Sequence, residues 1–248
     1  MIFLKTESEI AIMKQGGKIL RRILEKLQHE IKPGITPLEL SEKSLEFFQK
    51  ENVKPSFLKY KGYPTPICVS VNDQIVHGIP NQRPFEKGDL VSIDAGAKFQ
   101  KYHLDAAFTV AVGKVDKVHL KLIKASKDAL EKAIIMAQPG NHLFDISHTI
   151  QETIEKAGFE PVRECTGHGI GKKLHEDPQV PNFGKAGEGI VLEPGLVIAI
   201  EPMALENKTI VKIENDGWTV SSFDGCFTAH FEDTVAITKN GPKVLTRN

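Results

Sequence analysis

Apolar residues recur at helical spacing along the first part of the chain. The first run follows Thr6-Glu7-Ser8-Glu9, a capping-box pattern, and extends to Pro33-Gly34. Its apolar positions are Ile12, Gly16, Ile19, Ile23, Leu27 and Ile31. A second helix is predicted to begin with Thr36 as N-cap and Pro37 at the first helical position, and to end near Glu51.

Shorter apolar runs between and after the predicted helices indicate strands. Residues 66–80 predict a strand followed by a loop, and residues 89–112 alternate like a β-hairpin. Helical spacing returns over residues 117–137 and 143–157. From Phe159 onward the pattern predicts short strands separated by Gly, Pro and Asp. The order helix, helix, strands therefore occurs twice.

Two pairs of segments match in register, which favours an internal duplication. Residues 33–41 read P-G-I-T-P-L-E-L-S and residues 139–147 read P-G-N-H-L-F-D-I-S. Residues 86–94 (E-K-G-D-L-V-S-I-D) match residues 193–201 (E-P-G-L-V-I-A-I-E), at a spacing that differs by one residue. The alternative is shared turn chemistry, since Pro-Gly after a helix is common.

The duplication makes the 248 residues one domain of two halves, about 1–115 and 116–248. With 32 basic and 32 acidic residues, no net charge steers the protein to nucleic acid or to an anionic membrane. No apolar run approaches the roughly 18 residues of a membrane span, and the N-terminus lacks the apolar region of a secretory signal. Three scattered cysteines without C-x-x-C predict no disulfides and a cytoplasmic protein.

The second match places Asp94 and Glu201 at equivalent ends of equivalent apolar runs. A carboxylate there is costly unless it is paired or bound to a metal. If the hairpin turn is centred on Phe99-Gln100, Asp105 lies directly opposite Asp94, where two like charges destabilise the pair unless a divalent cation lies between them. The turn has neither Asn-Gly nor Asp-Gly, and a solvated hairpin end is the alternative.

The last predicted strand completes a symmetric set of acids. Residues 231–237 (F-E-D-T-V-A-I) echo residues 105–112 (D-A-A-F-T-V-A-V), which makes Glu232 the partner of Asp105. His168 has no counterpart in the other half. Four carboxylates and one imidazole differ from a structural zinc site, which favours Cys and His, and suit two divalent ions that activate water and polarise a carbonyl.

Glycines crowd His168 in the stretch T-G-H-G-I-G-K-K-L-H-E-D-P. Gly167, Gly169 and Gly171 are expected to let the backbone approach closely and turn the ring inward. His175 lies beyond metal reach in this interpretation and is free to donate a hydrogen bond to a developing oxyanion. A loop histidine satisfied by the backbone is the alternative for His168.

Taken together, these residues resemble type I methionine aminopeptidase, a family with the pita-bread fold, over about residues 3–247. The motifs that carry the resemblance are Y-K-G-Y-P at Tyr60, V-N-D-Q-I-V-H-G-I-P ending at Pro80, S-I-D-A-G and L-D around Asp94 and Asp105, T-G-H-G-I-G-K-K-L-H-E-D-P, I-E-P-M at Ile200, D-G-W-T-V at Asp216 and F-E-D-T at Phe231. The resemblance implies an α+β fold in which pseudo-two-fold α/β halves surround a curved antiparallel sheet, and a single catalytic domain over residues 1–248.

The implied activity is that of a metalloprotease and hydrolase that removes the initiator methionine from nascent proteins, preferring a small second residue. The resemblance implies two divalent ions (Co, Mn, Fe or Zn) and a bridging hydroxide that attacks the first peptide carbonyl. The implied metal ligands are Asp94, Asp105, His168, Glu201 and Glu232. Glu201 also matches the carboxylate that accepts a proton from the bridging water. The implied substrate-contacting and catalytic histidines are His77 and His175, and the residues in stretches associated with the methionine pocket are Tyr60, Tyr63, Cys68 and Trp218.

Three positions depart from the family pattern: Lys61 replaces a frequent His, Leu174 a frequent aromatic residue, and Phe57 a small residue or Cys. We therefore expect conserved chemistry and an altered substrate pocket. The implied partners are nascent polypeptides with an N-terminal methionine and, transiently, the ribosome, with no membrane association and a monomeric state.

Two other functions are considered. A proline-specific aminopeptidase, prolidase or creatinase of the same fold usually carries an additional N-terminal domain, whereas this chain begins its repeat almost at once. A catalytically inactive pita-bread module that binds other proteins would have lost metal ligands, whereas all five positions here hold metal-competent side chains. The 64 residues from His168 to Glu232 leave no room for the helical insertion of a type II methionine aminopeptidase.

Overall fold

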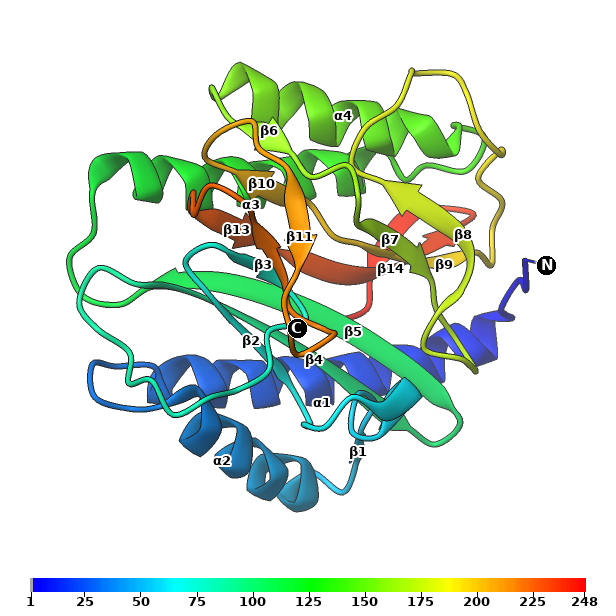
Figure 1. The fold of residues 1–248 in the computed structure, drawn as a ribbon. Coiled ribbons are helices and arrows are strands. Elements are labelled where there is room, and N and C mark those ends of the chain that lie inside the picture. The colour runs from blue at the N-terminus through cyan, green and yellow to red at the C-terminus, as the bar shows by residue number, and fades with distance from the viewer. Residues whose placement is uncertain (1) are drawn as a thin grey trace.

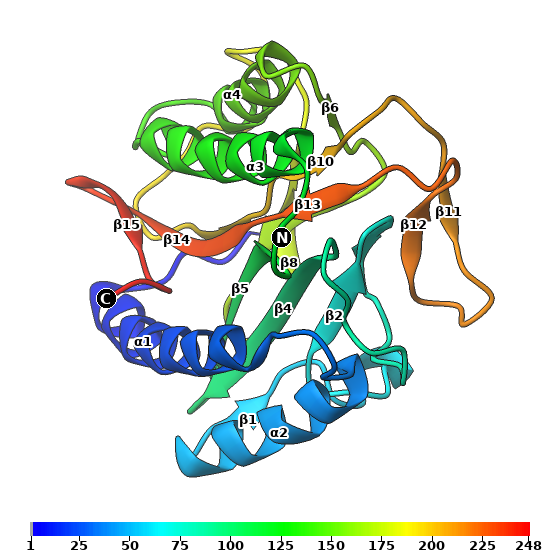
Figure 2. The same ribbon diagram turned by 90° about the vertical axis from the view of Figure 1, so that its left-hand side faces the viewer.

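The computed structural model describes residues 2–248, which form two helix pairs packed on a central antiparallel sheet (Figures 1 and 2). The α-helices are α1 (Glu7–Glu30), α2 (Pro37–Lys50), α3 (Lys117–Met136) and α4 (Leu143–Lys156), and a short 3₁₀ helix η1 covers Tyr60–Gly62. The strands are β1 (Lys54–Pro55), β2 (Cys68–Val71), β3 (Gln74–Val76), β4 (Leu90–Phe99), β5 (Tyr102–Ala111), β6 (Glu160–Pro161), β7 (Thr166–Gly169), β8 (Glu176–Pro181), β9 (Val197–Ile200), β10 (Met203–Leu205), β11 (Val211–Ile213), β12 (Val220–Ser222), β13 (Thr228–His230), β14 (Glu232–Thr238) and β15 (Gly241–Val244).

Helix α1 begins where its capping box predicts. The Thr6 hydroxyl accepts the Glu9 N–H at 3.2 Å, and the Glu9 carboxylate accepts the Thr6 N–H at 2.9 Å. Helix α2 repeats this arrangement with Thr36 as N-cap, and Pro37 occupies its first position as predicted. Both caps satisfy backbone N–H groups that have no partner inside the helix.

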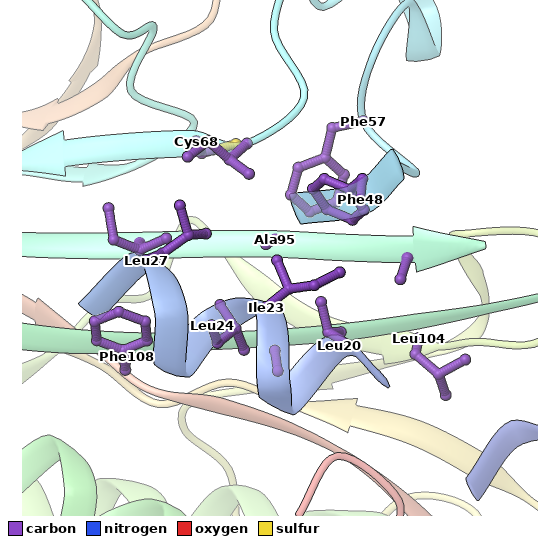
Figure 3. Close-up of a cluster of buried hydrophobic side chains, with 14 of the residues drawn as sticks. Leu20, Ile23, Leu24, Leu27, Phe48, Phe57, Cys68, Ala95, Leu104 and Phe108 are labelled. Atoms are coloured by element: carbon purple, nitrogen blue, oxygen red, sulfur yellow. The ribbon is translucent and has the colours of Figure 1, made fainter. Parts of the chain in front are cut away.

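The buried face of α1 differs in part from the predicted one. Ile23 and Leu27 are buried as expected, whereas Ile12, Ile19 and Ile31 are only half-buried. The residues that are buried are Ile10, Met13, Gly16, Gly17, Leu20, Ile23, Leu24 and Leu27. Both sets have helical spacing, and packing against β4 and β5 decides between them (Figure 3).

The largest sheet has nine strands in the order β1-β4-β5-β14-β9-β7-β8, with β2 also paired to β4 and β15 to β14. Within the described residues, neighbouring strands of this sheet pair antiparallel. Two three-stranded sheets, β13-β10-β6 and β11-β12-β3, adjoin it. The result is an α+β arrangement.

The predicted register of the β4–β5 hairpin is wrong by two residues. Asp94 lies opposite Ala107, and Asp105 lies opposite Gly96. The turn is the pair Gln100-Lys101, with Gln100 at φ 53°, and not Phe99-Gln100. Because side chains alternate with a period of two, this shift leaves both carboxylates on the same face as diagonal neighbours.

Each helix pair covers its own hydrophobic core. One core lies between α1, α2 and the β4–β5 hairpin and includes Ile23 and Phe48 (Figure 3). The other lies between α3, α4, β9 and β14 and includes Ile150 and Val235. No helix in the described part of the chain has the length and apolarity needed to cross a membrane. All three cysteines are free thiols, as predicted.

Candidate metal centre and active-site cleft

The sheet register gathers three carboxylates on one face. Asp94 in β4 and Glu232 in β14 are both paired with Ala107, which lies between them in β5. Residues paired across a sheet share a face, so these two side chains project together. Asp105 lies two residues from Ala107 in the same strand and therefore projects from that face as well.

The neighbouring strands add the remaining two predicted ligands. Glu201 follows the end of β9, and its side chain lies on the same face as that of Ala199, which pairs with His168 in β7. The Nε2 atom of His168 is 3.8 Å from Oε1 of Glu201 and 3.9 Å from Oδ2 of Asp105. The structure therefore brings together all five side chains that the sequence singled out as ligands.

The backbone around His168 sets the orientation of its ring. Nδ1 lies 2.9 Å from the carbonyl oxygen of Gly169. Since a carbonyl only accepts hydrogen bonds, Nδ1 carries a hydrogen, and Nε2 is the ring atom directed at the acids, which suits it to bind a metal through its lone pair when the ring is neutral. A Cβ on Gly167 would lie 2.4 Å from the carbonyl oxygen of Ala199, and one on Gly169 would lie 2.0 Å from that of Asp177. Glycine is needed at both positions for this close backbone approach.

Burial makes the negative charges of this cluster expensive. Loss of solvent raises the pKa of Asp94 and that of Glu201 to about 7. Burial and then the neighbouring carboxylates raise the pKa values of Asp105 and Glu232 well above the usual range. A cluster of this kind favours a bound positive charge, because a cation offsets both the desolvation and the mutual repulsion.

The donor atoms fit a divalent cation. Oδ1 of Asp94, Oδ1 of Asp105 and Oε1 of Glu232 are buried and have no hydrogen-bond partner within residues 2–248. Ligand atoms of Asp105, His168 and Glu232 all lie within 4.8 Å of one another. With metal–ligand bonds of about 2.0–2.2 Å, two donors on one ion lie at most about 4.4 Å apart, which accommodates the distances from His168 to the acids. Buried unpaired carboxylate oxygens of this kind are otherwise strongly disfavoured.

A cavity of about 180 Å³ opens beside the acids. It resembles in size a cavity of about 150 Å³ that holds benzene, so it suits one large apolar side chain. The aromatic ring of Tyr63 meets that of Trp218 edge-on at 5.2 Å, and the Tyr63 hydroxyl donates to the carbonyl of Gly78 at 2.9 Å. The predicted pocket residues that line the cavity are Tyr60, Tyr63, Cys68 and Trp218. The three residues that depart from the family pattern line it too: Phe57, Lys61 and Leu174.

Two further histidines face the same cavity. Nδ1 of His175 is 2.9 Å from the Tyr60 hydroxyl, and its ring lies edge-on to that of His168 at 4.4 Å. His77 has φ 58°, a left-handed backbone conformation that is uncommon outside glycine and tends to occur at functional sites. Loss of solvent in the cleft lowers the pKa values of His77 and His175, so both rings are neutral at pH 7.

Sequence reasoning missed two residues beside the acids. The Nε2 atom of buried His230 has no hydrogen-bond partner in the described chain and lies 3.6 Å from Oε2 of Glu201. The Thr234 hydroxyl accepts the Asp105 N–H at 2.9 Å and donates to the Asp105 carbonyl at 2.8 Å. His230, Glu232 and Thr234 alternate with a period of two, which was the available signal for a shared face.

Comparison with known proteins shows the family to which the chain belongs. The model of metallopeptidase family M24 matches residues 11–239. Methionine aminopeptidase of Clostridium acetobutylicum is 45% identical over 247 residues, covering 99% of both chains. Methionine aminopeptidase 1 of Bacillus subtilis is also 45% identical over 247 residues, covering 100% of both.

Solved structures show the same relation. Methionine aminopeptidase from Thermotoga maritima matches with a TM-score of 0.98 and 46% identity over 100% of both chains. The prolidase from Pyrococcus horikoshii matches with a TM-score of 0.80 and 26% identity, over 99% of this chain and 63% of the prolidase. These matches confirm the predicted pita-bread fold and enzyme class, and they favour neither alternative function. The chain therefore belongs to metallopeptidase family M24 and, within it, to the methionine aminopeptidases.

Proposed function

We propose that this chain holds two divalent metal ions in its carboxylate cluster and removes the N-terminal methionine from nascent polypeptides, preferring a small second residue. The observation that carries the proposal is the set of buried carboxylate oxygens without partners in residues 2–248, one each on Asp94, Asp105 and Glu232, which line a cavity sized for one side chain together with His168. The proposed ligands are Asp94, Asp105, His168, Glu201 and Glu232.

When bound, divalent ions at this position polarise the first peptide carbonyl and lower the pKa of water enough to make it a nucleophile at neutral pH. Carboxylates with one imidazole accept Co²⁺, Mn²⁺, Fe²⁺ or Zn²⁺, and availability selects among them.

Glu201 is the proposed proton acceptor. The attacking water transfers a proton to its carboxylate as the new C–O bond forms. The same proton then passes to the amide nitrogen of the second residue when the C–N bond breaks, which releases methionine and the shortened chain. Burial raises the pKa of this carboxyl group to about 7 in the metal-free cluster, and a bound cation would favour the carboxylate form that accepts the proton.

His175 is the proposed oxyanion donor. In this role Nδ1 of the neutral ring accepts the O–H of Tyr60, 2.9 Å away, and the ring hydrogen lies on Nε2. This N–H then donates to the carbonyl oxygen as negative charge develops on it. His77 is the second proposed substrate contact, and its left-handed backbone keeps its ring at the cavity wall.

The cavity is the proposed pocket for the methionine side chain, with Tyr60, Tyr63, Cys68 and Trp218 as its walls. The edge-on pair of Tyr63 and Trp218 provides a rigid apolar surface against which a flexible thioether packs well.

The remaining parts of the proposal concern organisation and location. We propose one catalytic domain with repeat halves of about 1–115 and 116–248. We further propose that the protein is a cytoplasmic monomer that meets its substrates during a transient contact with the ribosome.

Turnover of defined peptides tests this function. We expect hydrolysis of Met-Ala-Ser, with release of free methionine, in the presence of Co²⁺ or Mn²⁺, and we expect two equivalents of metal per chain by elemental analysis. An Ala-Pro peptide serves as the control. Hydrolysis of that peptide instead would indicate a proline-specific aminopeptidase, and hydrolysis of neither peptide would indicate a binding module.

A further inference from the structure

A second groove, of about 740 Å³, adjoins the methionine cavity. We call it the outer groove. It shares His77, His168, His175 and Glu201 with the cavity, so the proposed site of bond cleavage lies on the boundary between the two. Beyond this boundary the outer groove is formed by residues with no role in the proposed chemistry, among them Phe3.

The segment that carries Phe3 is anchored beside the active-site loop. Nζ of Lys5 donates to Oε2 of Glu176 at 2.6 Å, and each side chain is only 5% exposed. The Lys5 N–H also donates to the carbonyl of Gly195 at 2.7 Å. Glu176 directly follows His175, so this buried ion pair joins the start of the chain to the loop of the oxyanion donor, and Figure 1 shows this start of the chain beside β8.

Gly171 leaves the space that the ion pair occupies. A Cβ at this position would lie 2.5 Å from Cε of Lys5 and 2.9 Å from Oε1 of Glu176. One glycine of the G-H-G-I-G stretch therefore serves the N-terminal anchor and not the orientation of His168. A paired, desolvated Lys–Glu contact is costly to break, because one partner is then left as an unpaired buried charge.

Phe3 lies two residues before this anchor and is 53% exposed. A single exposed apolar side chain is ordinary on a protein surface. Phe3 differs because the chain is anchored two residues further on, at Lys5, next to a groove that continues into the catalytic cleft. An aromatic ring in such a place offers a large contact area with few rotatable bonds to a bound chain.

We infer that the outer groove receives the third and following residues of the substrate peptide and that Phe3 is its apolar wall, an assignment that rests on the proposed function. With the methionine side chain in the cavity and the first peptide bond at the boundary, the remaining chain must leave on the side away from the cavity. The outer groove begins there and shares four polar residues with the cavity. The protein's own N-terminal segment thus determines how strongly substrates longer than two residues bind.

The test compares a short and a longer substrate in wild-type protein and in the Phe3→Ala variant, with the preferred metal at saturation. Met-Ala amide fills the cavity and the boundary, and Met-Ala-Val-Leu extends into the outer groove. We expect Phe3→Ala to raise the KM of the tetrapeptide by roughly three- to tenfold, the range expected for loss of one aromatic contact. The KM of Met-Ala amide and both kcat values should stay unchanged.

Leu120→Ala is the matched control, because Leu120 is also 53% exposed and lies on α3. It should leave both peptides unaffected, and an unchanged Tm should show that both variants are folded. The inference is overturned if Phe3→Ala changes the KM of the two peptides equally, or changes neither. Failure of the wild-type protein to cleave both peptides would instead overturn the proposed function and this inference with it.

Discussion

The two halves of the chain have the same framework and different connections. In each half a helix pair precedes sheet strands that place two of the acids: Asp94 and Asp105 lie in β4 and β5 in the first half, and Glu201 directly after β9 and Glu232 in β14 in the second. The resemblance extends to the surface, where the ion pair between Glu46 and Lys50 of α2 recurs as one between Glu152 and Lys156 of α4.

The connections between helices and strands differ. Between α2 and β4 the first half carries Tyr60, Tyr63 and His77, which line the cavity. Between α4 and β9 the second half carries His168 and His175. Each helix pair and its strands thus supply two acids, and the connections that differ give the site a direction, with an apolar cavity at one end and the outer groove at the other.

The largest expected effect is a difference in kcat between variants of Glu201 and Asp94, the acids that end the two matched apolar runs. Glu201→Gln removes the proposed proton acceptor while keeping the shape of the side chain, and we expect kcat to fall by about 10³-fold or more. Metal binding should be weakened less than turnover, because the amide oxygen can still act as a ligand. The measurement is kcat at saturating Mn²⁺, together with the metal Kd from titration calorimetry.

Asp94→Asn is the control from the other half, since Asp94 has a proposed role as a ligand only. We expect its metal affinity to fall at least about tenfold, with much of kcat recovered when metal is saturating. Near-normal kcat in Glu201→Gln would show that the assigned role is wrong. Equal losses of kcat in both variants would show that the two positions do not differ in function.

The sequence predicted well those features that depend on neighbouring residues. The capping boxes and the helix bounds of α1 and α2 follow from hydrogen bonds between residues three apart. The acids were found because strand alternation and the repeat restrict which side chains share a face. The predicted hairpin register was wrong, because the register depends on where the turn forms and this turn has no strong sequence signal. The prediction that Asp94 and Asp105 share a face was still right, because the register error was an even number of residues.

Features that depend on distant partners could not be predicted. Lys5 and Glu176 are 171 positions apart, and nothing local distinguishes either from a solvated surface charge. The alternation of residues 230–234 indicated a shared face for Thr234, but it could not show that the Thr234 hydroxyl bonds the backbone of Asp105 in the neighbouring strand β5, 129 positions earlier in the chain. Phe3 likewise reaches the outer groove only because the start of the chain is anchored to Glu176, at the start of β8.

Substitutions in the two hydrophobic cores test whether both halves unfold in one transition. Ile23 and Ile150 are each fully buried, one in the core of each half. We expect Ile23→Ala and Ile150→Ala each to lower the free energy of unfolding by about 2–5 kcal/mol. If the chain is a single domain, each variant should shift one common transition, measured in urea by circular dichroism and by Trp218 fluorescence.

The conservative variants Ile23→Val and Ile150→Val are the controls and should cost about 0.5–1.5 kcal/mol. Two separate transitions, of which Ile23→Ala moves only one, would contradict the single-domain proposal. That result would mean that the shared sheet does not couple the halves.

The smallest expected effect concerns a contact that one half has and the other lacks. Glu51, directly after α2, binds Arg22 and Lys26 of α1, with Nζ of Lys26 at 2.8 Å, whereas Ala157 stands directly after α4. The hydrogen bond from Arg22 is the main cause that lowers the pKa of Glu51 from 4.5 to about 2. Because the pKa is lower in the folded protein, the stabilisation is complete above about pH 4.5 and is lost as the pH falls towards 2.

We expect Glu51→Gln to lower the free energy of unfolding by about 1 kcal/mol at pH 7, since the basic partners are partly exposed and solvent screens the pair. Urea unfolding at pH 7 and pH 3 should show this difference shrinking at the lower pH. Glu46→Gln is the control, because its pair with Lys50 is largely exposed and should contribute no more than a few tenths of a kcal/mol. If the free energy of unfolding fell equally at both pH values, Glu51 would act through packing at the end of α2. Its ion pairs with Arg22 and Lys26 would then not stabilise the contact between α1 and α2.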